Sequence, residues 1–167
     1  MSFNQSEAAK LVGAESGAIP ALDRVTKSDI RHWCEVIGDA DPDYAEKIKQ
    51  GAKTAPPAMT MVWSQPPLWP PSEASEPHEK LLRMLDEAGY KGTAGVKLEQ
   101  EFQQPIRIGD RLSFTVKVAG LSQGEEATKM GKGYLVDLHY AIRDGRGQVV
   151  STQTYTVFKF RSLELPS

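Results

Sequence analysis

The sequence predicts one α+β domain in which helices come first and an antiparallel sheet follows. Apolar residues recur at helical spacing as far as Ala88, and from Gly95 onward they alternate with polar residues. The 167 residues suffice for one hydrophobic core. Hydrophobic residues make up 40% and charged residues 25% of the chain, which is typical of an ordinary globular protein.

The charge balance and the rare residue types exclude several classes of function. A net charge of -2 gives no basic excess for a nucleic-acid binder that relies on counterion release. We find no apolar run of about 18 residues and no signal pattern in residues 1–20, so we expect a cytoplasmic protein without membrane contact. A single cysteine, Cys34, excludes an internal disulfide, and scattered histidines predict neither a metal site nor a cofactor.

The N-terminal part contains a clear helix signal. Residues 1–20 are small and polar, and we expect a weakly ordered arm. A helix is expected to begin after Thr26, an N-cap with Asp29 three residues later, and to end at Gly38. A second short helix is expected over 43–51.

The middle of the chain is rich in proline. Seven of the eleven prolines lie from Pro56 to Pro77. Proline is tolerated at a helix start, so we predict a buried helix over 57–65, which the following prolines then end. Helical spacing resumes over 79–88.

Four segments with a period of two predict the strands. They are 96–99, 112–118, 134–140 and 150–157, separated by turn residues. An apolar helix ahead of such a sheet is expected to lie across one sheet face. This is the hotdog arrangement, a sheet wrapped around a central helix that the prolines interrupt here, although other α+β folds share the same element order.

Four motifs carry a resemblance to a known family. Residues 31–44, 54–59 (Thr-Ala-Pro-Pro-Ala-Met), 85–90 and 105–110 resemble MaoC-like hydratases and dehydratases, which have the hotdog fold. The resemblance covers residues 24–162 and leaves an arm, 1–23, and a tail, 163–167. It is strongest with the N-terminal domain of the large subunit of two-subunit steroid enoyl-CoA hydratases. Those subunits carry a further domain, so we expect either one domain of such a protein or a free-standing relative.

The resemblance implies where catalytic residues would lie. Catalytic members carry Asp-x-Asn-Pro-x-His, whose Asp and His activate the water that adds to a 2-enoyl thioester. Here Asp39 falls on the family's Asp, Asp41 on the Asn and Tyr44 on the His. A tyrosine with a pKa of about 10 is a poor base at neutral pH, so the dyad is expected to be incomplete and Asp39 vestigial.

Other reactive residue types have structural interpretations. We expect His32 and His139 at the surface, His78 solvated, and Cys34 buried and inert. The proline-rich segment is either simple core or a wall for a bulky acyl group, since methionine and tryptophan offer adaptable apolar surface. The candidate substrate-binding residues are Pro56, Pro57, Met59, Met61, Trp63 and Trp69.

The resemblance therefore implies a non-catalytic, acyl-binding subunit or domain of a two-component 2-enoyl-CoA hydratase. Its partners would be a bulky acyl-CoA, such as a steroid side-chain thioester, and a catalytic hotdog subunit that supplies the Asp/His dyad. Two alternatives remain open at this stage. One is an acyl-CoA binding or scaffold module without chemistry, and the other is a homodimeric hotdog hydratase or thioesterase.

Overall fold

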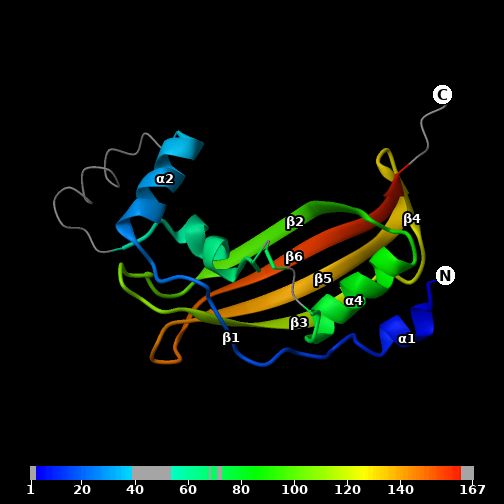
Figure 1. Ribbon diagram of the computed structural model, residues 1–167, viewed down its shortest axis with the longest axis horizontal. Helices are drawn as coiled ribbons and strands as arrows, with labels where there is room; N and C mark the ends of the chain where they lie inside the picture. The colour runs from blue at the N-terminus through cyan, green and yellow to red at the C-terminus, as the bar shows by residue number, and fades with distance from the viewer. Residues whose placement is uncertain (1–2, 39–53, 68, 71–72, 163–167) are drawn as a thin grey trace.

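The computed structural model describes residues 3–38, 54–67, 69–70 and 73–162. Its centre is an antiparallel sheet in the order β1-β3-β5-β6-β2, with β4 beside β5 (Figure 1). The strands are β1 (Ile19–Pro20), β2 (Gly92–Phe102), β3 (Ser113–Leu121), β4 (Glu126–Thr128), β5 (Gly131–Arg143) and β6 (Val149–Ser162). The four predicted strand segments are confirmed, and each strand is longer than its alternation signal.

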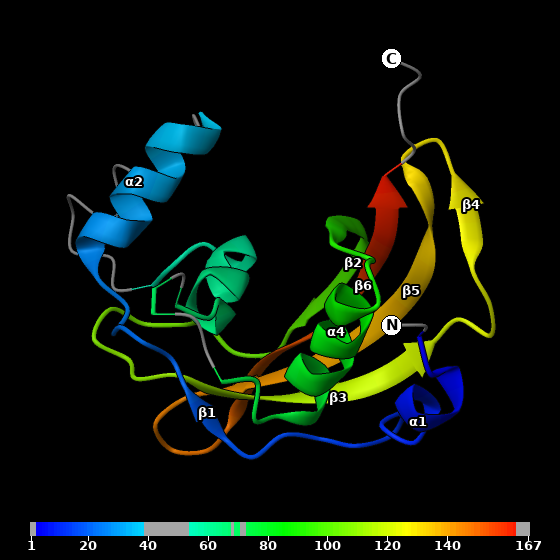
Figure 2. The same ribbon diagram turned by 45° about the vertical axis from the view of Figure 1, so that its right-hand side comes forward.

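Two helices cover one face of the sheet, which we call the inner face (Figures 1 and 2). The helices of the described residues are α1 (Gln5–Ala9), α2 (Lys27–Ile37), η1 (Pro57–Ser64) and α4 (Pro77–Glu87). Helices η1 and α4 lie on the inner face, whereas α2 projects beyond the sheet. No helix within the described residues is long and apolar enough to cross a membrane.

The core fills the space between the inner face and these two helices. Leu81 and Leu85 of α4 are fully buried, as are Val116 and Val136 of the sheet, and Met59 of η1 is almost so. Burying an aliphatic side chain of this size contributes about 1.5–3 kcal/mol, so the core holds η1 and α4 on the sheet. The predicted placement of an apolar helical segment across one sheet face is therefore confirmed.

The predicted helix boundaries depend on local capping. The hydroxyl of Thr26 accepts a hydrogen bond from the backbone N–H of Asp29 at 3.2 Å, and Gly38 ends α2 with a φ of 62°. The helix expected over 57–65 forms as the 3-10 helix η1, and the one expected over 79–88 begins earlier, at Pro77. The helix expected over 43–51 lies outside the described residues.

The expectation of a weakly ordered N-terminal arm is wrong for the residues that the structure describes. Backbone hydrogen bonds join Gly13 N–H to the Val118 carbonyl at 2.8 Å and Ser16 N–H to the Val116 carbonyl at 2.9 Å. Phe3 packs against two tyrosine rings of the body. These backbone pairings anchor the arm along β3, although its side chains carry little apolar signal.

Candidate functional site

The helical layer over the inner face is interrupted between η1 and α4. Helix η1 ends at Ser64, where Gln65 takes an extended conformation, and α4 begins at Pro77. Each helix starts with proline, a residue favoured at the first helical position. The N-terminus of α4 is closed by a capping box between Glu76 and Glu79. The proline-rich residues 65–76 thus separate two independently started helices.

A chain of polar side chains holds η1 to the sheet. Gln153 of β6 is buried on the inner face, and its amide oxygen accepts a hydrogen bond from Gln100 of β2 at 3.1 Å. Its amide nitrogen lies 3.5 Å from the hydroxyl of Ser64, which donates to the Met61 carbonyl at 3.1 Å. These contacts satisfy a buried amide that would otherwise be costly, and they fix the C-terminal end of η1.

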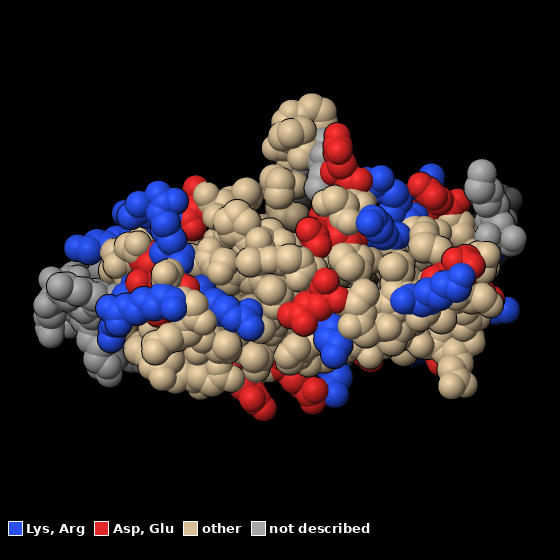
Figure 3. Space-filling model, turned by 90° about the horizontal axis from the view of Figure 1, so that it is seen from below, with Lys and Arg blue, Asp and Glu red and all other residues tan. Residues whose placement is uncertain are grey.

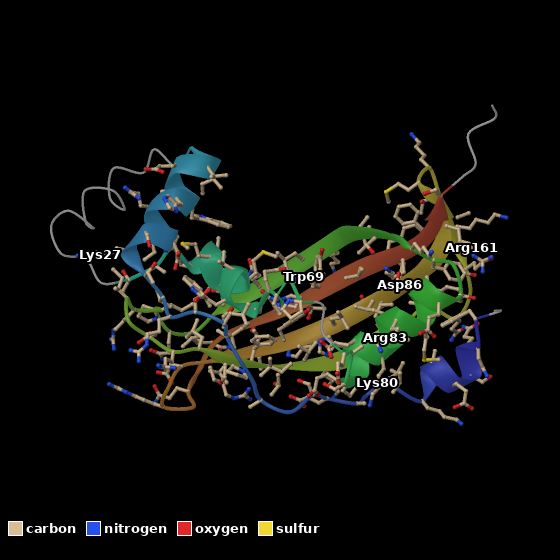
Figure 4. All side chains as sticks on the ribbon, in the orientation of Figure 1. Lys27, Trp69, Lys80, Arg83, Asp86 and Arg161 are labelled. Atoms are coloured by element: carbon tan, nitrogen blue, oxygen red, sulfur yellow. The ribbon has the colours of Figure 1, made fainter. Side chains whose placement is uncertain are left out.

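A second polar cluster holds the other end of the broken helix. The buried Lys159 ammonium of β6 lies 2.6 Å from a carboxylate oxygen of Asp86 on α4, and it donates to the hydroxyl of Thr93 at 2.7 Å. Arg161 donates to the Ala88 carbonyl at 2.6 Å, so two cations of β6 meet the C-terminal end of α4 (Figure 4). Both lie where the helix dipole favours positive charge.

Between the two anchored helices, the inner face at β2 carries exposed apolar side chains. Leu98 is 39% and Phe102 48% exposed, and both lie on the inner face because they pair with Tyr155 and Ser151 of β6. Among the described elements β2 pairs only with β6, so its other edge has no strand partner. An edge strand of 11 residues that exposes Leu98 and Phe102 on its inner face indicates a binding surface.

A hollow opens beside this edge at the start of η1. Its volume is about 300 Å³, and it is lined by Thr54, Ala55, Pro57 and Thr60 on one side and by residues 102–106 on the other. A hydrogen bond from the Ala55 N–H to the Ile106 carbonyl, 2.8 Å long, ties the two walls together. The hollow is large enough for part of a small apolar ligand.

The comparisons with known proteins identify the family. Residues 10–153 match the family model described as FAS1-like, dehydratase domain region. The chain belongs to this family. The predicted hotdog fold of MaoC-like proteins is confirmed by a solved MaoC-like dehydratase, with a TM-score of 0.61 at 19% identity over 92% of this chain and 43% of that one.

Two curated proteins are similar to this FAS1-like dehydratase domain. The chain is 27% identical over 152 residues to the 3-oxo-4,17-pregnadiene-20-carboxyl-CoA hydratase alpha subunit of Mycobacterium tuberculosis, covering 88% of this chain and 48% of that protein. It is 32% identical over 148 residues to a probable enoyl-CoA hydratase alpha subunit of Thermomonospora curvata, covering 83% and 46%. The chain thus spans about half the length of these relatives.

A solved complex is similar over nearly the whole domain. The structure of the ChsH1-ChsH2 complex from Mycobacterium tuberculosis superposes with a TM-score of 0.78 at 25% identity, covering 98% of this chain and 94% of that one. The HadBC dehydratase complex of the same organism shares the fold, with a TM-score of 0.54 at 13% identity over 86% of this chain and 95% of that one. Both structures are complexes of two different subunits, and this domain superposes on a chain of each.

The candidate substrate-binding residues of this dehydratase domain differ in burial and in position relative to the hollow. Pro57 lines the hollow, whereas Pro56, Met59 and Trp63 are buried. Met61 is half-buried on η1. Trp69 is 85% exposed and does not line the hollow (Figure 4).

The candidate catalytic residues Asp39 and Tyr44 lie outside the described residues, as does Asp41. Within the described part of the chain, no three His, Cys, Asp or Glu side chains gather as metal ligands would.

The three histidines lie in different environments. His32 is exposed and lies 3.1 Å from a guanidinium nitrogen of Arg31, and His139 lies on the face opposite η1 and α4, 3.2 Å from the hydroxyl of Thr154. The expectation that His78 is solvated is wrong: it is half-buried at the start of α4, and its Nδ1 is buried with no partner among the described residues. Burial lowers the pKa of His78, and the charges of Glu79 and Glu76 oppose this shift.

Sequence reasoning missed the anchoring residues. Gln153 and Lys159 share a face with Val157 in the alternation of β6, so the period of two already placed these polar residues toward the core. Their partners, Ser64 and Asp86, come from distant parts of the chain, and no sequence spacing indicates them. Cys34, expected to be buried, is half-buried on α2.

Proposed function

We propose that this chain is the acyl-binding, non-catalytic hotdog subunit or domain of a two-component 2-enoyl-CoA hydratase. Its substrate is a bulky acyl-CoA thioester, with a steroid side-chain thioester as the leading candidate, and a partner hotdog subunit supplies the Asp/His dyad. The observation that carries the proposal is the interruption of the central helix beside an uncovered apolar strand edge.

The interruption supports a large acyl group. A continuous helix along the inner face would cover the sheet between Ser64 and Pro77, whereas here Leu98 and Phe102 stay exposed beside it. Because these side chains are already more than half buried, covering the rest of each gains roughly 1 kcal/mol, which favours a bulky apolar ligand or partner there. The hollow between Pro57 and Phe102 extends this surface toward the start of η1.

The distribution of histidines supports a catalytic partner. Hydration requires a base that takes a proton from water while the oxygen bonds to the β-carbon, and an acid that returns a proton to the α-carbon. His32 is exposed on α2, His78 is half-buried at the start of α4, and His139 lies on the far face of the sheet. With a tyrosine at position 44, this domain holds the acyl group, and the partner performs the proton transfers.

The partner would join at the free edge of β2. The free edge of this 11-residue strand presents backbone donors and acceptors that a second hotdog sheet can satisfy, and the joined sheet would remove both edges. The similarity to chains of the ChsH1-ChsH2 and HadBC complexes supports this hetero-oligomeric assembly.

Reconstitution tests the proposal. The pure chain is incubated with a steroid side-chain enoyl-CoA, alone and with an Asp/His-bearing hotdog subunit, and hydrated product is measured. We expect hydration only in the mixture, and Asp39→Asn should then change turnover less than tenfold. Brisk hydration by the chain alone, or a loss of about 10⁴ in Asp39→Asn, would return the chemistry to this chain. Release of free CoA would instead identify a thioesterase, and ligand-induced stabilisation without turnover a binding module.

The acyl surface has its own test. Phe102→Ala should raise KM for the bulky thioester in the reconstituted enzyme and leave a four-carbon enoyl-CoA unaffected, because only the larger group reaches the hollow. Val36→Ala, on the exposed part of α2, is the matched control. Equal effects of Phe102→Ala on both substrates would contradict the assignment.

A further inference from the structure

The sheet face opposite η1 and α4, which we call the outer face, carries an ordered pattern of charge. No helix of the described residues lies on this face (Figures 1 and 2). The strand register aligns its side chains in rows that run across β3, β5, β6 and β2. One row consists of Lys117, His139, Thr154 and Glu99. A second row consists of Thr115, Ala141, Thr152 and Glu101.

The β2 side of the outer face is acidic and hollowed. A depression of about 410 Å³ lies there, and Glu99, Glu101 and His139 are among its walls. The side chain of Glu99 is 64% exposed and pairs with the equally exposed Lys97 at 2.9 Å. An exposed pair of this kind is weak, so a better-placed cation can replace it.

The β3 side of the outer face carries two cations, Lys117 and Arg143, with Glu15 of the arm paired opposite Lys117. Lys117 is exposed at the end of the first row, and Arg143 lies next to the second row, 3.4 Å from the hydroxyl of Thr115. Between the two rims these rows hold His139, Thr154, Ala141 and Thr152, and the next row holds Asp137 and Thr156. Seen from below, where the β1 and β3 edge of the sheet faces the viewer, the surface carries scattered clusters of both signs (Figure 3).

We propose that the outer face binds a second copy of this chain, related by a two-fold axis that runs parallel to the strands between β5 and β6. This rotation keeps each row in place and exchanges β3 with β2, so that Lys117 of each copy faces Glu99 of the other. The ammonium group then enters the acidic depression twice per dimer. A two-fold axis across the strands would instead place β2 over β2, acid against acid, and charge complementarity excludes it.

The size of the face suits such an interface. Four strands spaced about 4.8 Å apart and about nine residues long cover roughly 500 Å² on each copy. A total near 1,000 Å² is at the lower end for specific association. Glu15, the neighbour of Lys117 in the arm, lies beyond β3 and outside the overlap.

This interface leaves the β2 edge free. The side chains of Glu99 and Glu101 point to the outer face, whereas a partner sheet at the edge would use the β2 backbone. The inference therefore does not depend on the proposed function, and in the assembled enzyme it would join two units back to back.

Two charge-reversal variants, measured alone and mixed, test the proposal. Sedimentation velocity of the full chain should show a dimer, and Lys117→Glu or Glu99→Lys should each weaken it tenfold or more, because each reversal creates two like-charge contacts. An equimolar mixture of the two variants should restore a dimer that contains one chain of each. Lys27→Glu, the same charge change on α2, should have no effect (Figure 4).

Crosslinking gives an independent result. A zero-length carbodiimide crosslink between Lys117 and Glu99 can form only between copies, since three strand spacings, about 14 Å, separate the residues within one chain. Its recovery from the dimer supports the proposal. A monomeric wild-type chain, a dimer that persists in both single variants, or a mixture that fails to associate would overturn it. Activity with the catalytic partner is measured separately, so failure here is distinguishable from failure of the proposed function.

Discussion

Replacing Asp86 should destabilise the fold more than replacing its buried partner, Lys159. Its ammonium is enclosed on the inner face and pairs with Asp86, whose side chain is 46% exposed. Among the residues that the structure describes, Asp86→Ala leaves the buried cation with the Thr93 hydroxyl as its side-chain partner. Breaking a buried pair costs about 3–5 kcal/mol, and because water can reach part of this site we expect a loss of about 2–3 kcal/mol.

Replacing Lys159 should lower the free energy of unfolding less than replacing Asp86. Lys159→Met keeps the packing of the side-chain stem and removes the buried charge, and the carboxylate of Asp86 can then turn to water. The loss of the hydrogen bond to Thr93 accounts for about 1 kcal/mol. We therefore expect Lys159→Met to lower the free energy of unfolding by no more than about 1 kcal/mol.

Urea unfolding followed by tryptophan fluorescence measures both effects. The midpoint should fall further for Asp86→Ala than for Lys159→Met with unchanged m-values, and Asp86→Asn should resemble Asp86→Ala because the charge is what matters. A Lys159→Met variant that loses as much stability as Asp86→Ala would refute the reasoning, since the ammonium would then contribute net stability.

Three further predictions concern single positions. Gly133→Ala should cost about 3 kcal/mol, because a Cβ there would lie 1.9 Å from the Lys159 carbonyl oxygen, whereas Gly124→Ala meets nothing and should cost under about 0.5 kcal/mol. Thr26→Ala should lower the free energy of unfolding by about 1 kcal/mol, and Thr26→Ser should restore it. Burial lowers the pKa of His78, so the unfolded chain binds a proton first and stability should fall as the pH drops below about 6.5. His78→Gln should flatten that slope in thermal melts at several pH values, and an unchanged slope would assign it to other groups.

The sequence predicted the elements whose signals are local. Thr26, Asp29 and Gly38 mark both ends of α2, since capping depends only on neighbouring residues. Alternation located the four long strands, but β2 begins earlier than predicted. Its first residues, Gly92 to Gly95, have little strand propensity, and they extend the sheet because aromatic rings of β6 pack over the two glycines.

The candidate site was predictable only in part. The proline cluster indicated an interrupted helix, and the interruption is present between Ser64 and Pro77. The hollow joins Pro57 to Phe102, which the sequence separates by a whole helix, so only tertiary structure brings them together. Trp69 looked equally suited to bind an acyl group, but no local rule shows that it faces solvent.

The two halves of the broken helix have separate attachments, η1 through Gln153 and α4 through Lys159. Insertions or deletions in residues 65–76 can therefore lengthen or shorten the opening without shifting either anchor. Under the proposed function, changes in this connecting segment alone would suit the domain to acyl groups of different size. An engineer who wishes to alter the range of accepted substrates would begin there and leave the sheet untouched.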